Sequence, residues 1–258
     1  MSTIGLKAQM AITGMVLLGF VVGHMLGNLQ IFLGPEAINN YAATLHGTPA
    51  LIWGTRVTLL LAVAVHIFSA YTLTARSKAA RPVGYKDRQW LGASYPARTM
   101  RWGGVILLAF IVYHLLHLTV AAPVLPSESV DVLSTGDYGP AQPACEHKEV
   151  ALKVIASNGA EFKGTDDVGS IISKQVVCDN VYDNVIRGFN FIPVSLFYIL
   201  AQIMLGMHIA HGLWSATRTL GLSSPKLSDN AEKAALALGG LITLGNCSIP
   251  LAVMFGLL

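Results

Sequence analysis

Residues 10–33, MAITGMVLLGFVVGHMLGNLQIFL, decide what kind of protein this is. The stretch contains no Asp, Glu, Lys or Arg, and a helix that crosses about 30 Å of hydrocarbon needs roughly 20 apolar residues. A secretion signal has a shorter apolar region, about 7–15 residues, followed by a small-residue cleavage site. Because this stretch is longer and carries His24 and Asn28, we expect a permanent transmembrane helix.

Four more stretches of this kind follow along the chain. Of the 258 residues, 53% are hydrophobic and only 12% are charged, and the mean hydropathy is +0.56. These values lie outside the range of soluble domains. The sequence therefore predicts an all-α membrane protein with five transmembrane helices in a bundle. The predicted helices cover residues 10–33, 51–75, 102–125, 189–215 and 234–258.

The Lys and Arg residues in the connections predict the orientation of the bundle, because positive residues near helix ends stay on the cytoplasmic side. The connection after the first helix has neither residue before Arg56, whereas the next connection has a single acid, Asp87. The basic residues of that second connection are Arg76, Lys78, Arg81, Lys86, Arg88, Arg98 and Arg101. We therefore expect a cytoplasmic N-terminus and an external C-terminus.

The connection between the third and fourth helices, residues 126–187, is long, polar and rich in acidic side chains. In this orientation it is an external loop. It contains Cys145 and Cys178, and the oxidising external compartment favours a disulfide between them, with two unpaired thiols as the alternative. Cys247 lies in the fifth predicted helix, where we expect a small packing residue.

Histidines recur inside the predicted helices, where an ionisable side chain is costly and therefore suggests a function. A single histidine there often makes a hydrogen bond between helices. Here, however, four helices carry at least one each, and only His46 and His147 lie in external connections. The histidines within the helices are His24, His66, His114, His117, His208 and His211.

Imidazole is a common ligand of haem iron, so these histidines suggest haem binding. The chain has no C-x-x-C-H sequence, which excludes covalent c-type attachment. Zinc is the rival metal, but zinc sites need three or four converging side chains, usually including Cys or carboxylate. Histidines spread over four helices favour pairs, and two pairs would hold two b-type haems within the bundle.

Depth in the membrane predicts which histidines pair. His24 and His114 each lie roughly 18–20 Å from the cytoplasmic end of their helix, which predicts an outer haem. His66 and His208 lie within roughly 10–14 Å of that end, which predicts an inner haem. His117 and His211 each follow a predicted ligand by three residues and are alternative ligands, or partners of a haem propionate or a neighbouring helix. Arg56 has two candidate roles as well. It would either form an ion pair with a propionate or extend toward lipid headgroups.

Four local sequences resemble the haem-ligand segments of a known family. They are VGHMLGN around His24, AVHIFSAY around His66, VYHLLHLT around His114 and MHIAHGLWS around His208. The family is that of the single-polypeptide, two-haem cytochrome b subunits of bacterial succinate dehydrogenases and fumarate reductases. Its fourth-helix motif is similar to residues 208–215, which favours His208 over His211, and the first histidine of HLLH matches its third ligand. The resemblance covers all five helices, while the external loop departs from the compact members.

The resemblance implies a membrane anchor of succinate:quinone oxidoreductase in the bacterial cytoplasmic membrane. A flavoprotein subunit and an iron–sulfur subunit would dock on its cytoplasmic face, and two haems b would carry electrons between the iron–sulfur subunit and a quinone, with menaquinone expected. The chain has no dinucleotide-binding glycine motif and no iron–sulfur cysteine run, so the dicarboxylate chemistry would belong to the partners. We expect contact with membrane lipid and no nucleic-acid partner, and a higher oligomer of the complex stays open.

Quinone chemistry needs proton exchange, and the connection after the first helix offers Glu36, Tyr41 and His46. His46 is the favoured candidate, because its position resembles the stretch where some relatives place a quinone-side carboxylate and imidazole titrates near neutral pH. An ordinary interfacial histidine is the alternative. Two other function classes remain open. One is a di-haem anchor of another respiratory enzyme, such as formate dehydrogenase, and the other is a transporter, although the sequence shows no convincing internal repeat.

Overall fold

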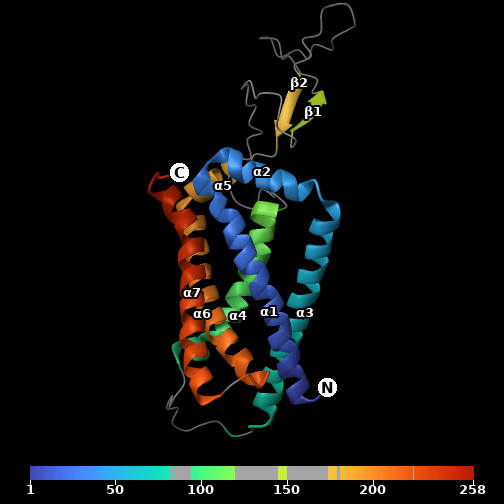
Figure 1. The fold of residues 1–258 in the computed structure, drawn as a ribbon, viewed down its shortest axis with the longest axis vertical. Coiled ribbons are helices and arrows are strands. Elements are labelled where there is room, and N and C mark those ends of the chain that lie inside the picture. The colour runs from blue at the N-terminus through green and yellow to red at the C-terminus, as the bar shows by residue number, and fades with distance from the viewer. Residues whose placement is uncertain (82, 84–93, 120–144, 150–173, 179–180, 223) are drawn as a thin grey trace, which may run out of the picture.

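Five helices stand side by side in a bundle, and all five are long and apolar enough to cross a membrane (Figure 1). The structure is a computed structural model that describes residues 1–81, 83, 94–119, 145–149, 174–178, 181–222 and 224–258. The five helices are α1 (Thr3–Asn28, continued by the 3-10 turn η1, Leu29–Leu33), α3 (Pro49–Ala79), α4 (Tyr95–His114, continued by the π-helical turn η2, Leu115–Thr119), α6 (Ile192–Thr219) and α7 (Pro225–Met254). The chain is a five-helix membrane protein.

Local chemistry explains where several of these helices begin and end. Ser2 caps α1, since its hydroxyl accepts a hydrogen bond of 3.1 Å from the N–H of Gly5. Proline occupies the first turn of α3, α4 and α6, where its missing N–H costs no helical hydrogen bond. Gly34, with φ 102°, separates η1 from the next helix, and only glycine adopts that backbone easily.

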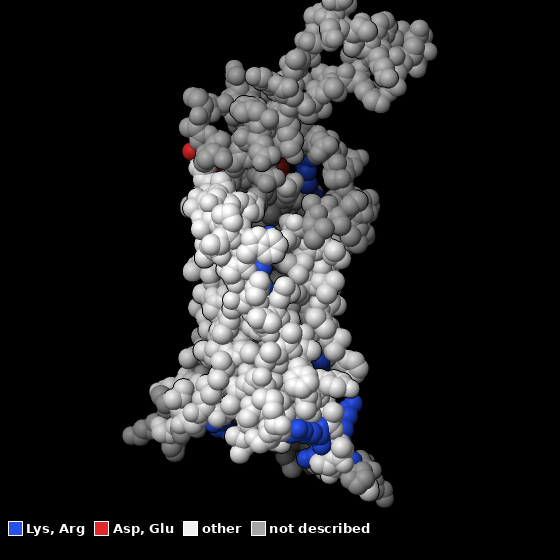
Figure 2. Space-filling view, turned by 90° about the vertical axis from the view of Figure 1, so that its right-hand side faces the viewer, with Lys and Arg blue, Asp and Glu red and all other residues white. Residues whose placement is uncertain are grey.

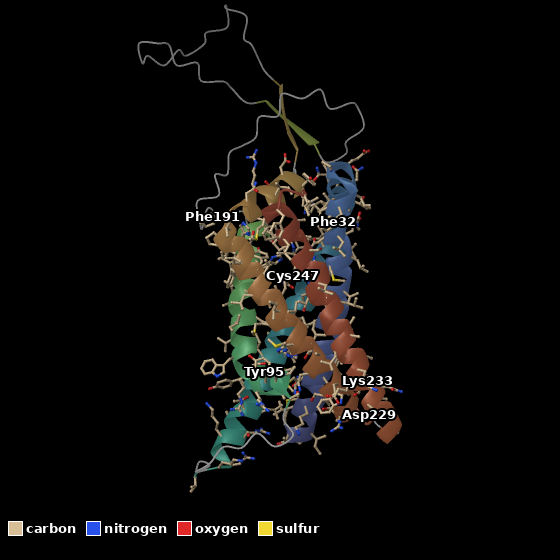
Figure 3. The ribbon with its side chains drawn as sticks, turned by 90° about the vertical axis from the view of Figure 1, so that its left-hand side faces the viewer. Phe32, Tyr95, Phe191, Asp229, Lys233 and Cys247 are labelled. Carbon is tan, nitrogen blue, oxygen red and sulfur yellow. The ribbon has the colours of Figure 1, made fainter. Side chains whose placement is uncertain are left out.

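The two ends of the bundle differ. The N-terminus lies at one end, called here the N-terminal end, and Figure 2 shows Lys and Arg side chains gathered there. Figure 3 places Tyr95, Asp229 and Lys233 near that end, Cys247 at mid-height, and Phe32 and Phe191 near the other end. Two shorter helices, α2 (Pro35–His46) and α5 (Val181–Asn190), lie across that other end, which we call the cap end (Figure 1).

The predicted ranges need correction. The first and third helices begin earlier than expected, at Thr3 and Tyr95 rather than at 10 and 102. The final helix begins at Pro225 rather than at 234, because proline suits the first turn of a helix and the helix formers Ala231, Glu232 and Lys233 join this turn to the apolar stretch.

The fourth predicted helix is divided, since Phe191 is extended (φ −81°, ψ 100°) and separates α5 from α6. The connection after the first helix contains α2, which the sequence reading did not predict. The predicted end of the third helix, residues 120–125, lies outside the described residues.

The long connection between α4 and α6 holds two short strands before α5. Strand β1 (Cys145–Glu149) pairs with β2 (Lys174–Cys178) in an antiparallel register that places Cys145 opposite Cys178. Helix α5 contacts α2, and the N–H of Tyr182 donates a hydrogen bond of 3.1 Å to Oδ1 of Asn39. The loop therefore returns to the bundle through α5.

Helices α6 and α7 form the closest contact in the bundle. A Cβ added to Gly239 would lie 2.5 Å from the carbonyl oxygen of Gly206, so the two backbones nearly touch. Glycine permits this approach, as is common between membrane helices. Nearby, Nδ2 of Asn246 donates a hydrogen bond of 2.9 Å to Oε1 of the buried Gln202. Cys247 is also buried against α6, as expected of a packing residue.

Candidate paired-histidine sites

His66 of α3 and His208 of α6 face each other in the half of the bundle near the N-terminal end. Their ring centroids are 6.2 Å apart, and the rings are tilted by 56°. Nδ1 of His66 lies 3.1 Å from the carbonyl oxygen of Met10 and 3.2 Å from Oγ1 of Thr13. A carbonyl oxygen can only accept, so Nδ1 carries the proton. Nε2 of His66 therefore keeps its lone pair, as a metal ligand must.

One ring nitrogen of His208 lacks a hydrogen-bond partner among the described residues. This nitrogen is Nδ1, and it is buried. An unpaired buried nitrogen is unfavourable and uncommon in native proteins, so it calls for an explanation.

His24 of α1 and His114 of α4 form a second pair, nearer the cap end. Their ring centroids are 5.8 Å apart, and the rings are nearly perpendicular at 82°. Phe20 stacks on His24 with 5.2 Å between centroids, and Phe110 stacks on His114 at 5.6 Å. Nδ1 of His114 lies 3.3 Å from Oη of Tyr198. As in the first pair, one histidine is held through Nδ1.

Both pairs fit the span of a metal ion with two axial imidazoles. A metal–imidazole bond is about 2.0–2.1 Å, so two such bonds in line set the ring centroids about 6.3 Å apart. The observed distances of 6.2 and 5.8 Å are close to that span. No hydrogen bond joins the two rings of either pair in the described part of the chain. Within the same part, no group of three or more His, Cys, Asp or Glu side chains converges as a zinc site would require.

Glycines lie beside the histidines on α1 and α6. A Cβ added to Gly19, Gly23 or Gly212 would have no neighbour within 4 Å. Gly23 directly precedes His24, and Gly212 lies one turn after His208. Gly19 and Gly23 are exposed, so the open space beside them is the outer surface of α1.

A basic cavity lies at the N-terminal end, beyond the His66–His208 pair. Its volume is about 260 Å³, and Leu73 and Ser215 in its wall lie two turns beyond His66 and His208, or about 10 Å along the helix axes. Its remaining lining residues are Lys7, Met10, Thr74, Ser77, Arg101 and Thr219. Among the described residues the structure gives no ion-pair partner for Lys7 or Arg101. Two cations and several hydroxyls suit a ligand that carries carboxylates.

An open apolar groove of about 410 Å³ runs between α1 and α3 near the cap end. Phe20, which stacks on His24, forms part of its wall together with Leu51, Thr55 and Thr58. The groove therefore leads from the lipid-facing surface to the neighbourhood of the second histidine pair.

The other predicted site residues lie outside both pairs. Nδ1 of His117 is 3.0 Å from Oη of Tyr198. The ring of His211 lies 5.9 Å from that of Trp214, between centroids. The guanidinium of the exposed Arg56 sits 5.3 Å from the centre of the Trp53 ring, which places it on the outer surface of α3.

The three quinone candidates lie on α2, at the cap end. Glu36 and His46 are exposed. Tyr41 instead packs on Gly27, where an added Cβ would lie 2.6 Å from its Oη. Gly27 is one turn beyond His24, so Tyr41 is the candidate that reaches into the bundle toward the second pair.

The sequence reading missed the groups that hold the histidines. The Met10 carbonyl has no sequence signal, because any residue supplies one. Tyr198 did carry a signal, since a phenol within an apolar helix usually has a hydrogen-bond partner. The partner itself depends on how α4 and α6 are rotated against each other.

No family model, no curated protein and no solved structure matches the chain. Its function is therefore inferred from the geometry of the two histidine pairs and the motifs around them.

Proposed function

We propose that the chain is the two-haem cytochrome b anchor of a bacterial succinate:quinone oxidoreductase. The observation that carries this proposal is the geometry of the two histidine pairs. They lie at different heights in one bundle, and each has the separation of two axial ligands. The four motifs that resemble the family surround these same histidines. Each haem would supply a one-electron redox centre.

The residues of the chain have distinct roles in this proposal. His66 and His208 hold the inner haem, with the His66 ring oriented by the Met10 carbonyl and Thr13. His24 and His114 hold the outer haem. Lys7 and Arg101, with the hydroxyls of their cavity, provide a counter-charge for the inner haem's propionates.

The two ends of the bundle would meet different partners. The basic N-terminal end faces the cytoplasm, as the excess of Lys and Arg predicts, and receives the iron–sulfur and flavoprotein subunits. At the cap end, the apolar groove beside Phe20 admits an isoprenoid quinone from the membrane, with menaquinone expected. Tyr41, His46 and Glu36 are the candidates for exchanging its protons.

The experiment that tests the proposal measures haem directly. The chain is purified from membranes, its haem is quantified, and dithionite-reduced minus oxidised spectra are recorded. The wild type is compared with separate His24→Ala, His66→Ala, His114→Ala and His208→Ala variants, and with His117→Ala and His211→Ala, which test the alternative ligands. We expect two b haems per chain, loss of one haem in the His24 and His114 variants, and loss of the other in the His66 and His208 variants.

Two results would contradict this assignment. A wild type without haem would contradict the proposal that the chain is a cytochrome. Undiminished haem in all four variants would contradict the assignment of the ligands. Mass spectrometry of subunits that co-purify from the native membrane separates the enzyme classes. A flavoprotein and an iron–sulfur subunit with succinate dehydrogenase activity support the proposal, whereas a formate-oxidising partner would replace it with the other respiratory class.

A further inference from the structure

Tyr198 of α6 connects two histidines of α4 through one hydroxyl group. Its side chain is buried, with 5% of its surface exposed. Its Oη lies 3.3 Å from Nδ1 of His114 and 3.0 Å from Nδ1 of His117. A phenol in the membrane interior that has two imidazole partners is positioned to influence both.

The ring of Tyr198 is held rigidly enough for this role. Phe110 of α4 packs against it edge to face with 5.0 Å between centroids, and Phe189 of α5 does the same at 4.8 Å. The carbonyl oxygen of Phe189 accepts a hydrogen bond of 2.6 Å from Oγ of the buried Ser195. The phenol therefore sits between α4 and the anchored end of α5.

The donors and acceptors of this group form a chain with one consistent direction. If His114 binds iron through Nε2, its Nδ1 carries a proton and donates to Oη of Tyr198. The phenol has a single proton, which it then donates to Nδ1 of His117. His117 consequently carries its own proton on Nε2. If the hydrogen bonds ran in the opposite direction, His117 rather than His114 would have Nε2 free to bind iron. It is His114, however, whose ring lies 5.8 Å from that of His24.

Helix α5 packs against His117, at the far end of this series of hydrogen bonds. A Cβ added to Gly188 would lie 2.8 Å from both Cε1 and Nε2 of His117, so the α5 backbone packs directly on that ring. His117 itself belongs to the π-helical turn η2, and such turns often occur at functional sites. Helix α5 is therefore linked to His114 through His117 and Tyr198.

We propose that Tyr198 is a positioning residue that orients His114 as the outer haem ligand, and that α5, acting through Gly188 and His117, holds Tyr198 in place. The inference rests on the proposed function, because it concerns the haem between His24 and His114. A hydrogen bond donated from Nδ1 makes the imidazole a stronger ligand and fixes its ring. Stronger donation favours oxidised iron, so the bond lowers the potential of that haem.

The test is a redox titration of the purified wild type and of Tyr198→Phe, followed by optical and low-temperature EPR spectra. Phenylalanine keeps the ring and removes only the hydroxyl. We expect both haems to remain bound, the midpoint potential of the outer haem to rise and its low-spin EPR signal to change, while the inner haem keeps its potential. The matched control is Tyr113→Phe, because the Tyr113 hydroxyl is buried without a partner among the described residues.

Two further comparisons separate a specific bond from a general disturbance. In a His24→Ala background only the inner haem remains, and there Tyr198→Phe should leave the potential unchanged. His117→Phe should shift the outer haem less than Tyr198→Phe does, and should add nothing once Tyr198 has been replaced.

Unchanged potentials and spectra in Tyr198→Phe would overturn the inference, and so would equal shifts of both haems or an equal effect of Tyr113→Phe. A wild type that binds two haems while Tyr198→Phe has no effect leaves the proposed function standing and removes this inference alone. A wild type without haem overturns both.

Discussion

Nδ1 of His66 lies 3.1 Å from the main-chain carbonyl oxygen of Met10, which joins α3 to α1 inside the membrane. Because the acceptor is backbone, no replacement of the Met10 side chain removes it. Thr13, one turn further along α1, places its hydroxyl 3.2 Å from the same nitrogen. The orientation of His66 is therefore set by the path of α1.

Gly14 offers a direct test of this arrangement, because an added Cβ would already lie 3.3 Å from Cε1 of His66. In Gly14→Val the larger side chain should displace the imidazole, so we expect loss of the proposed inner haem and retention of the proposed outer one. Haem quantification and reduced spectra of the purified variant measure this. Gly240→Val is the control, since Gly240 is exposed on α7 with no neighbour within 4 Å of an added Cβ. Two haems retained in Gly14→Val would contradict the expectation.

The contact between α6 and α7 predicts a loss of stability when Gly239 is replaced. A side chain there meets the Gly206 backbone, so Gly239→Leu must separate the two helices. We expect the free energy of unfolding to fall by about 1–3 kcal/mol, as for other overpacked sites. Unfolding in mixed detergent micelles, followed by circular dichroism, measures this change. Gly240→Leu, one position further, should unfold like the wild type, and an equal loss in both variants would refute the role of the contact.

The strand register predicts that Cys145 and Cys178 form a disulfide. Directly opposed residues of antiparallel strands have Cα atoms about 4.5–5.5 Å apart, and disulfides span about 4.4–6.8 Å between Cα atoms. Peptide mass spectrometry of protein purified from membranes, with and without reduction, should show one linked peptide pair. In Cys145→Ser the Cys178 thiol should become open to alkylation, while the buried Cys247 stays protected until unfolding. Alkylation of both Cys145 and Cys178 in the unreduced wild type would contradict the bridge.

At the cap end, His46 is exposed on the surface, whereas Tyr41 packs inside. We expect His46→Ala to keep both haems and to lose quinone-linked turnover, because an imidazole at this position would exchange the protons of the quinone. Tyr41→Phe tests the side chain that packs on Gly27 next to His24. Succinate:quinone reductase activity of the whole complex is measured, with Asn40→Ala, an exposed change on the same helix, as control. Full turnover in His46→Ala would make it an ordinary interfacial residue.

The five spans could be predicted from the sequence because the requirement is local. A helix in hydrocarbon needs enough consecutive apolar residues, and its backbone groups bond within the helix itself. Counting residues along each span also predicted the heights of the histidines, since the rise per residue is constant. His24 and His114 thus belong to one level, and His66 and His208 to another.

Rotation and packing were decided only by the tertiary structure. A helix that is apolar on all sides has no polar face from which its rotation can be read, and its neighbours determine which side chains meet. The bond from His66 to the Met10 carbonyl, the two contacts of the Tyr198 hydroxyl and the approach of Gly188 to His117 all depend on such rotations. The same holds for the cap, because α2 and α5 are short helices whose positions depend on contact with each other and with the bundle end.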